Sequence, residues 1–440
     1  MGKKALWIGN VHFPSGSTEE ADDALLLVAK AAKRRAALRT KLKKAGKGAK
    51  ASQKAQAAYL GSSLVRLDAL IRAAKHLDYN KKLSVPQYEL MADELKLYAQ
   101  IEEPVRVYLK EKSSGGHRYF CDFGVRHRAA QALVADMINA QLSPKPFQYN
   151  VKGRGVAVAI KQIRQLHADG YKNVVRLDIQ RFFDSFDHKA IMQVLPIAKD
   201  LTDHVVIGKH FELQGQHLNK EDKHLQDILN HYLSLIAERG LPQGSACSPA
   251  IANFVISKIE PKLPKGARFL NYVDDFLILA QSPERAEKAK NALTSSIEEM
   301  PVGHFELLEK SSGSLLSGVE FLGHAIAEQP AGVFTVSVSL ANVYKIMAWT
   351  AEEHEKIADK FAADHGKAWV TFDAFAANVR FAHRVYSWLQ TFKQADDVDE
   401  YEEELLERIE TLALATGQDA DKIKSLAKKM PINDVEPYFS

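Results

Sequence analysis

The chain has 440 residues, 46% of them hydrophobic and 26% charged, and its 59 Lys and Arg against 55 Asp and Glu give a formal net charge of +4. This composition is typical of a soluble globular chain long enough for two or three domains. Its two cysteines, Cys121 and Cys247, exclude a disulfide framework and a thiolate zinc site and suit a reducing cytoplasm. No 18-residue apolar run or cleavable leader pattern marks the chain for a membrane or for secretion, so we expect a cytoplasmic location.

A run of positive charge marks the first hundred residues. Eleven Lys and Arg and no acid lie between Lys30 and Lys54, which favours binding of a polyanion. The alternative is a solvated Ala/Lys-rich helix or a disordered arm that binds nothing. Apolar residues then recur at helical spacing over 60–74 and again after Pro86. Residues 1–100 are therefore predicted to form a basic helical extension. Its expected nucleic acid contacts are Lys33, Arg34, Arg35, Lys43 and Lys44.

A glycine-tipped hairpin is predicted next. Residues 105–112 alternate as a strand does, residues 113–116 form a turn, and residues 117–120 return as a second strand. Lys110, Lys112 and Arg118 lie on this hairpin and could bind a triphosphate. Basic residues beside a Gly-Gly turn are more often simply solvated, so the hairpin alone is a weak signal.

Two further segments carry a stronger signal. An apolar strand over 174–179 contains Asp178, and a carboxylate at the end of a buried strand is well placed to bind Mg²⁺. Asp184 and Asp187 could compete for this role, but they lie beyond an aromatic pair, toward the following helix. Further along, a Pro-Gln-Gly turn at 242–244 leads into a helix of small residues that begins near Ser248.

The strongest signal is a pair of adjacent carboxylates, Asp274 and Asp275. Strand-forming runs at 269–273 and 276–280 flank them, which predicts a β-hairpin with both carboxylates at its tip. Adjacent carboxylates repel each other and are costly to desolvate, so a divalent cation is expected beside them. A solvated Asp-Asp turn is the alternative. It is disfavoured because an Asp-bearing strand, a Pro-Gln-Gly turn and this hairpin follow one another within about a hundred residues.

The last hundred residues read as helices. Apolar residues recur at helical spacing over 343–361, 372–392 and 405–412, which predicts three amphipathic helices. Nine carboxylates and only Arg408 lie between Asp396 and Glu410, and we interpret this stretch as a solvated helix face that nucleic acid avoids.

Three of these segments resemble the palm motifs of reverse transcriptases. Leu177–Asp184 resembles the first catalytic motif, Leu241–Gly244 the second and Tyr272–Asp275 the third. The other resemblances are to the fingers of bacterial, group II intron-like enzymes at 115–118, 125–131 and 153–154, to the motif D lysine at Lys310, and to the primer grip at 321–323. The resemblance covers about Arg106 to Ala325.

This resemblance implies an α+β fold, a right-hand polymerase with fingers and palm around an antiparallel catalytic sheet and with a helical thumb. The implied domains are the basic extension at 1–100, fingers with part of the palm at 101–175, palm at 176–335, and thumb with an acidic tail at 336–440.

The resemblance also implies residue roles. Asp178, Asp274 and Asp275, with the Ile179 carbonyl, would bind two Mg²⁺ ions, for which Mn²⁺ could substitute, and Lys310 would protonate the leaving pyrophosphate. The implied nucleotide contacts are Lys112 and Arg118 on the triphosphate, Gln243 and Gly244 on the incoming nucleotide and template base, and Phe183 as a steric gate under the ribose. The implied nucleic acid contacts are Arg126, Arg128, Arg154, Tyr272, Phe321, Leu322 and Gly323.

The implied activity is RNA-directed synthesis of cDNA from dNTPs on a structured non-coding RNA, as in stand-alone, defence-associated reverse transcriptases that act against phage. A retron-type or group II intron-derived enzyme is an alternative, although the chain lacks the Asn-Ala-x-x-His and Val-Thr-Gly segments expected of retron enzymes. Two readings from other classes are an RNA-binding scaffold without polymerase activity and an RNA-dependent RNA polymerase, which usually lacks an aromatic gate such as Phe183. No membrane partner is expected, and the oligomeric state is open.

Overall fold

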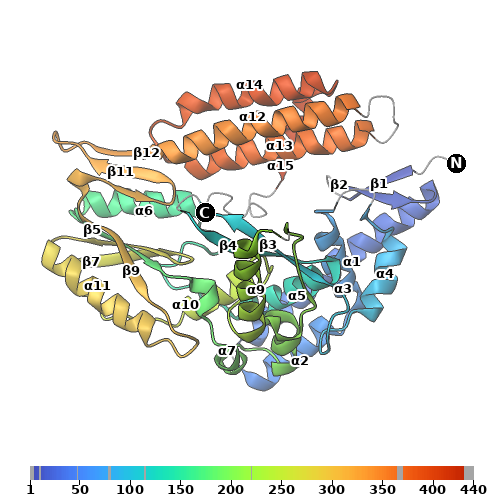
Figure 1. Ribbon diagram of the computed structural model, residues 1–440, viewed down its shortest axis with the longest axis horizontal. Helices are drawn as coiled ribbons and strands as arrows, with labels where there is room; N and C mark the ends of the chain where they lie inside the picture. The colour runs from blue at the N-terminus through green and yellow to red at the C-terminus, as the bar shows by residue number, and fades with distance from the viewer. Residues whose placement is uncertain are drawn as a thin grey trace. The chain divides into compact units, whose positions relative to one another are not determined.

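The computed structural model describes residues 4–8, 11–46, 48–77, 81–112, 115–219, 221–363 and 370–430. The chain forms two compact units, whose elements are labelled in Figure 1. Unit 1 comprises residues 1–146, 179–260 and 296–306, and unit 2 comprises residues 147–178, 261–295 and 307–440. Within the described ranges, no helix combines the length and the apolar character needed to cross a membrane.

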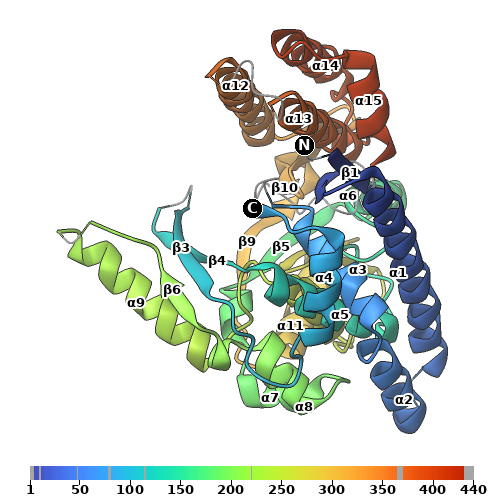
Figure 2. The ribbon, with the colours of Figure 1, turned by 90° about the vertical axis from the view of Figure 1, so that its right-hand side faces the viewer.

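The N-terminal part of unit 1 is a β-hairpin followed by helices. Its elements are β1 (Lys4–Ile8), β2 (Val11–Ser15), α1 (Thr18–Ala45), α2 (Ala49–Leu60), α3 (Ser63–Ala74), α4 (Val85–Glu94) and α5 (Val125–Gln141). The predicted helices over 60–74 and after Pro86 are thus α3 and α4, whereas the hairpin β1–β2 was not predicted. Helix α3 packs against α1, α4 and α5, and Figure 2 shows α1 running beside it.

Helix α1 begins and ends where its sequence favours it. The Ser17 hydroxyl accepts a hydrogen bond from the Glu20 backbone N–H at 3.1 Å, which caps the first turn. Acids lie in the first turn and Lys43 and Lys44 in the last, as the helix dipole favours. The positive run therefore covers the C-terminal half of a stable helix and continues onto α2.

A buried ion network fastens α1 to α5. The Arg35 guanidinium donates to both oxygens of Asp136, through Nε at 2.8 Å and Nη2 at 3.0 Å. The Tyr59 hydroxyl also donates to Asp136, at 2.6 Å, and Arg39 Nε lies 3.2 Å from its other oxygen. Burial favours the neutral acid, but these donors outweigh it and hold the pKa of Asp136 below its usual value. Arg35, an expected nucleic acid contact, is therefore committed to this network.

A three-stranded sheet with the order β4-β3-β6 forms a second layer of unit 1. It consists of β3 (Val105–Glu111), β4 (His117–Asp122) and β6 (Leu213–Gly215), and α9 (Lys223–Glu238) covers one face. The other elements of unit 1 are η2 (Phe182–Ser185), α7 (His188–Val194), α8 (Lys199–Leu201), η3 (Thr202–Val206), η4 (Gly208–His210) and α10 (Ser248–Ile256).

Unit 2 is built on a four-stranded sheet with the order β7-β8-β5-β9. Its elements are α6 (Val156–Ala168), β5 (Asn173–Ile179), β7 (Ala267–Tyr272), β8 (Asp275–Ala280), α11 (Pro283–Glu298) and β9 (Leu307–Ser314). β8 pairs antiparallel with both β7 and β5. The apolar face of α6, with Ile160 and Ile163, shares a core with Leu270 and Leu277 of the sheet. This packing leaves the β7–β8 turn at one end of a rigid sheet.

The rest of unit 2 is a small sheet followed by a helical bundle. The elements are η5 (Leu315–Ser317), β10 (Val319–Phe321), β11 (His324–Glu328), β12 (Phe334–Val338), α12 (Leu340–Ala363), α13 (Val370–Phe392), α14 (Asp399–Ala415) and α15 (Ala420–Lys429). Trp388, Leu405 and Ile409 are buried where the helices meet, and both ribbon views show the helices side by side. Three helices were predicted here, and α15 is an additional one.

The start of the acidic stretch differs from its predicted role. Asp396 accepts a hydrogen bond from the Val336 backbone N–H at 2.9 Å and from Arg164 at 2.6 Å. Asp397 accepts one from the Val338 backbone N–H at 2.8 Å. These two carboxylates accept hydrogen bonds from backbone N–H groups of β12 and so fix the α13–α14 connection. The solvated acidic face therefore begins only with α14.

Candidate active site

The β7–β8 hairpin carries the adjacent aspartates, as predicted, but only Asp274 lies at its tip, because Asp275 is the first residue of β8. Tyr272 pairs with Asp275 across the hairpin, so Val273 and Asp274 form its two-residue tip. Val273 adopts a left-handed conformation with φ = 59°, which is strained for a β-branched residue. The buried Asn271 amide holds the tip by donating to the Val273 carbonyl at 2.9 Å. Asp274 therefore lies at the tip of a turn whose backbone is strained and is held by Asn271.

The neighbouring strand brings a third carboxylate to the same place. Asp178 lies directly opposite Asp275 in the antiparallel pairing of β5 with β8. Lys310 on β9 extends its ammonium to within 3.1 Å of Asp178 Oδ2. All four predicted catalytic residues therefore come from adjacent strands of one sheet. Ile179, whose carbonyl was expected to assist, is the buried last residue of β5.

Arg176 was not singled out from the sequence, yet it binds one of the aspartates. Its Nε lies 3.1 Å from Asp275 Oδ1 and its Nη2 lies 2.9 Å from Oδ2. Burial alone would lower the pKa of Arg176, but the bonds to Asp275 and the charges of Glu320 and Asp178 outweigh it and raise the pKa. A polar residue two positions before Asp178 on the same strand face was the only available signal.

The electrostatics of these carboxylates fit a bound cation. Burial, followed by the charge of Asp178, raises the pKa of Asp274 to about 7. Burial also raises the pKa of Asp275, although Arg176 opposes it. The donor set is entirely oxygen, which suits Mg²⁺ or Mn²⁺, and a divalent ion would offset both the burial and the repulsion that raise the pKa of Asp274. The residues present therefore fit the implied metal.

In unit 1, the Pro-Gln-Gly turn lies against β4. The Cys121 backbone N–H donates to the Gln243 carbonyl at 2.8 Å. Gly244 has φ = 97°, and a Cβ there would lie 2.4 Å from the Cys121 carbonyl, so only glycine fits. The Gln243 side chain donates to Asp184 at 3.2 Å, and burial raises the pKa of Asp184. Asp184, which was considered for a metal role, instead orients Gln243.

The expected nucleotide contacts otherwise lie on η2 and on the β3–β4 hairpin. Phe183 is half-buried, with its ring centre 5.5 Å from that of the fully buried Phe182. Lys112 is exposed and Arg118 is half-buried beside the hairpin tip. Ser113 and Ser114 of the predicted turn lie outside the described residues. All five expected nucleotide contacts therefore belong to unit 1, and the carboxylates belong to unit 2.

The segment 321–323 forms the turn between β10 and β11. Phe321 is fully buried in the core of unit 2, so its ring supports the turn and cannot lie against a nucleic acid, contrary to our expectation. Leu322 and Gly323 both have positive φ, 50° and 75°, and are half-buried.

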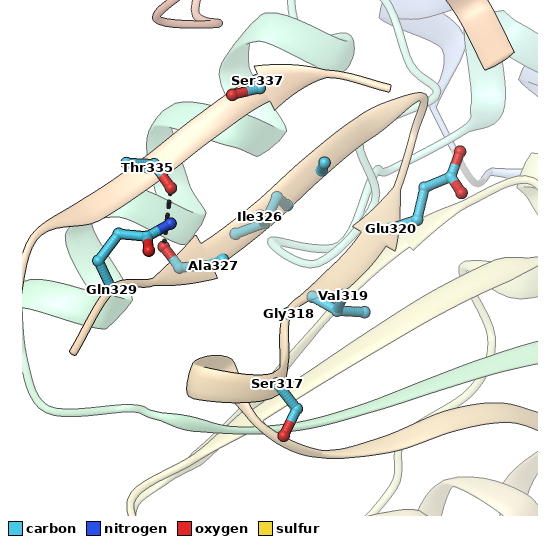
Figure 3. A pocket seen from close by; sticks show the side chains of 10 residues that line it. Ser317, Gly318, Val319, Glu320, Ile326, Ala327, Gln329, Thr335 and Ser337 are labelled. Atoms are coloured by element: carbon cyan, nitrogen blue, oxygen red, sulfur yellow. Dashed lines mark hydrogen bonds between the residues drawn. The ribbon is translucent and has the colours of Figure 1, made fainter. Parts of the chain in front are cut away.

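A groove of about 460 Å³ opens on the sheet formed by β10, β11 and β12. In Figure 3, Glu320 and Ser317 lie on its β10 side and Thr335 and Ser337 on its β12 side. The Thr335 hydroxyl donates to the Ala327 carbonyl at 3.4 Å across the two strands. The groove is thus lined mainly by short side chains and backbone, with one carboxylate.

The remaining expected nucleic acid contacts differ in whether their side chains already bind other groups of the protein. Arg128 donates to the Phe123 carbonyl at 2.7 Å and to Asp122 at 3.2 Å, and Arg154 donates to the Gln148 carbonyl at 2.7 Å. Arg126 and Tyr272 are half-buried, and burial raises the pKa of Tyr272. Of the contacts expected on α1, Lys33, Arg34, Lys43 and Lys44 are exposed, as are the neighbouring Lys30 and Lys41, whereas Lys47 lies outside the described residues.

The family model described as reverse transcriptase (RNA-dependent DNA polymerase) matches residues 109–326. Together with the antiparallel pairing of β7, β8 and β5, this match confirms the predicted fold class. Among curated proteins, none matches the chain.

Several solved structures resemble the chain at low identity. Apo telomerase from Candida tropicalis, truncated from the C-terminal domain, is 13% identical with a TM-score of 0.34, covering 57% of this chain and 60% of that one. The Sicinivirus 3Dpol RNA-dependent RNA polymerase is 10% identical with a TM-score of 0.31, covering 77% and 70%. Telomerase from Candida albicans in complex with a TWJ fragment of telomeric RNA is 10% identical with a TM-score of 0.33, covering 78% and 70%.

Residues 109–326 are therefore a reverse transcriptase domain, and the enzymes of this family are RNA-directed DNA polymerases, a class of nucleotidyltransferase.

Proposed function

We propose that this chain is an RNA-directed DNA polymerase whose metal-binding residues are Asp178, Asp274 and Asp275, with the Ile179 carbonyl. The observation that carries the proposal is the strand register, which places Asp275 opposite Asp178 and leaves Asp274 at the tip of the strained β7–β8 turn. When bound, two Mg²⁺ ions, or Mn²⁺ in their place, would activate a primer 3′-hydroxyl and stabilise the leaving pyrophosphate.

The neighbouring cations would complete this site. Lys310 Nζ, 3.1 Å from Asp178 Oδ2, would carry the proton that the leaving pyrophosphate oxygen takes up. Arg176 would fix the orientation of Asp275 through its two-point bond, because a planar guanidinium matches both carboxylate oxygens at once. Neither residue would need to move far to act.

The nucleotide pocket would be formed by the residues of unit 1. Gln243, held by Asp184, would contact the incoming nucleotide, and Gly244 beside it would contact the template base. Phe183 would lie under the ribose and clash with a 2′-hydroxyl, which favours dNTPs over ribonucleotides. Lys112 and Arg118 would bind the triphosphate.

For the template, we propose a structured non-coding RNA that the enzyme copies into cDNA, in the cytoplasm and in defence against phage. Support comes from the exposed cations Lys33, Arg34, Lys43 and Lys44 on α1, because a one-sided positive helix binds an RNA backbone without reading its sequence. Arg35 is excluded from this surface because Asp136 holds it.

Primer extension tests the activity. With an RNA template, a DNA primer and Mg²⁺, we expect extension with dNTPs and little with ribonucleotides. Extension with ribonucleotides alone would identify an RNA polymerase instead, and RNA binding without any extension would identify a scaffold.

For the template, RNA that copurifies from the host should be one dominant sequence, and a heterogeneous pool would contradict a dedicated template. Phage plating with the parent chain and with Asp274→Asn would test the defence role, which requires protection by the parent alone.

A further inference from the structure

A cluster of metal-ligating side chains lies in unit 1, outside every role assigned above. Asp203, His204 and His210 each present a ligand atom, and these atoms all lie within 4.8 Å of one another. His210 Nε2 is 2.8 Å from Asp203 Oδ2, and the rings of His204 and His210 have centres 4.7 Å apart. All three residues are half-buried, so a small ion could reach them from solvent.

The backbone that gathers these residues is irregular. Asp203 and His204 lie in η3, a π-helical turn, and His210 ends η4, a 3₁₀ turn. Single π-helical turns are rare and frequently occur at functional sites. Gly208 presses η4 against α9, because a Cβ there would lie 2.4 Å from the Ile236 carbonyl. The two turns are thus held in place by packing, independently of the side chains that they bring together.

One buried atom in the cluster has no partner. His204 Nδ1 is buried and has no hydrogen-bond partner among the residues that the structure describes. A buried polar atom without a partner costs free energy, and native structures rarely leave one. The His210–Asp203 hydrogen bond accounts for two members of the cluster but not for His204. A ligand shared by all three residues would account for the whole arrangement.

The donor set selects the class of ligand. Two imidazoles and one carboxylate suit zinc and similar divalent transition metals, with water in the remaining position, whereas Mg²⁺ prefers oxygen donors throughout. We propose that Asp203, His204 and His210 bind one divalent transition-metal ion of the zinc class. Lys209 would compete with the metal ion for Asp203, since its ammonium lies 4.0 Å from Asp203 Oδ1. The Lys209 side chain is exposed and can turn away when the ion binds.

The bound ion would link η3 to η4 beneath α9. Helix α9 in turn supports the β3–β4 hairpin, because the Tyr232 hydroxyl donates to the His117 carbonyl on β4 at 2.8 Å and Tyr232 packs at the core between α9 and the β3–β4 sheet. Metal binding to folded but not unfolded chain stabilises the fold. We therefore expect the ion to stabilise this part of unit 1, at a site separate from the carboxylates that would bind Mg²⁺.

Metal content of the full, untagged chain tests the proposal, because a histidine tag would bind the same ions. After exposure to Zn²⁺ in buffer with millimolar Mg²⁺ and removal of free ion, we expect about one zinc per chain and a raised melting temperature. Co²⁺ in place of Zn²⁺ should give a visible ligand-field spectrum. The double variant His204→Ala/His210→Ala should lose the ion and the spectrum, while His224→Ala, an exposed histidine on α9, should keep both.

Two conservative variants cover the case in which the double variant does not fold. Asp203→Asn keeps the shape of the side chain and should weaken zinc binding at least about ten-fold, since even replacing a residue that only supports a metal ligand typically costs that much. Lys209→Met removes the competing charge and should strengthen binding. Less than a tenth of an ion per parent chain, or equal binding by the parent and Asp203→Asn with no gain in Lys209→Met, would overturn the proposal.

Discussion

The Arg176 guanidinium binds Asp275 at two points, with Nε 3.1 Å from Oδ1 and Nη2 2.9 Å from Oδ2. The protein itself therefore already neutralises Asp275, while Asp274 on the same turn is not paired in this way and has its pKa raised to about 7. The two adjacent aspartates are thus not equivalent.

Replacing Arg176 should reduce synthesis and stability together. In Arg176→Met the side chain keeps much of its apolar length, but Asp275 loses its partner while buried, which costs about 3 kcal/mol when a buried pair is broken. We expect the single-turnover extension rate to fall about ten- to a hundred-fold. Arg176→Lys should recover only part of it, because an ammonium cannot bind both oxygens in the plane. A parental rate and melting temperature in Arg176→Met would show that the pair has no role.

Replacing Phe183 should relax discrimination between sugars. In Phe183→Ala the clash with a 2′-hydroxyl disappears, so the ratio of kcat/KM for a dNTP over its ribonucleotide should fall about ten-fold or more. Phe183→Tyr keeps the ring and serves as the control, with an unchanged ratio. If Phe183→Ala discriminates as the parent does, another residue is the gate.

The cations of α1 should separate into two groups. Arg35→Ala leaves Asp136 buried with fewer donors and should destabilise the fold by about 3 kcal/mol, measured by denaturant unfolding. Lys43→Ala/Lys44→Ala should leave unfolding unchanged but weaken RNA binding. The slope of log K against log salt should become shallower by about 0.7 to 0.9 for each lysine that no longer neutralises a phosphate. An unchanged slope in the double variant would remove these lysines from the RNA-binding surface.

Buried neutral histidines should make the fold sensitive to acid. Burial lowers the pKa of His324 to about 4, from an ordinary value of 6.5. Between these values the unfolded chain binds the proton more tightly, so stability is lost as the pH falls below about 6.5, by about 1 kcal/mol from this residue between pH 7 and 5.5.

The contribution of His324 can be isolated by substitution. His324→Asn should flatten the dependence of unfolding free energy on pH over this range, whereas the exposed His217→Asn should not. An equal pH dependence in the parent and His324→Asn would contradict a neutral buried ring.

The site could be predicted where its chemistry is local in sequence. Two apolar runs around Asp274 and Asp275 predict the β7–β8 hairpin, and an apolar run likewise predicts the strand that carries Asp178. Arg176 was missed because its partner lies 99 positions away, and a single polar residue in a strand looks like a solvated one. Pairing across that distance depends on strand order, which no local pattern specifies.

The partners of charged side chains elsewhere in the chain could not be predicted from the sequence either. The cations between Lys30 and Lys54 read as one surface, but Arg35 faces Asp136, 101 positions away in α5. Asp396 and Asp397 read as part of an exposed acidic helix, yet they satisfy backbone N–H groups of β12. In each case the sequence shows the sign of the charge but not the group that the charged side chain binds, because tertiary packing determines that partner.

Primer extension by Asp274→Asn tests the central claim most directly. The substitution keeps the shape of the side chain and removes only its charge, so it should leave the melting temperature and RNA binding near those of the parent. We expect dNTP incorporation on an RNA template to fall by about 10³-fold, while Asp200→Asn, an exposed carboxylate on α8, extends as the parent does. Synthesis by Asp274→Asn at the rate of the Asp200→Asn control would contradict the assignment of the carboxylate cluster as the polymerase centre.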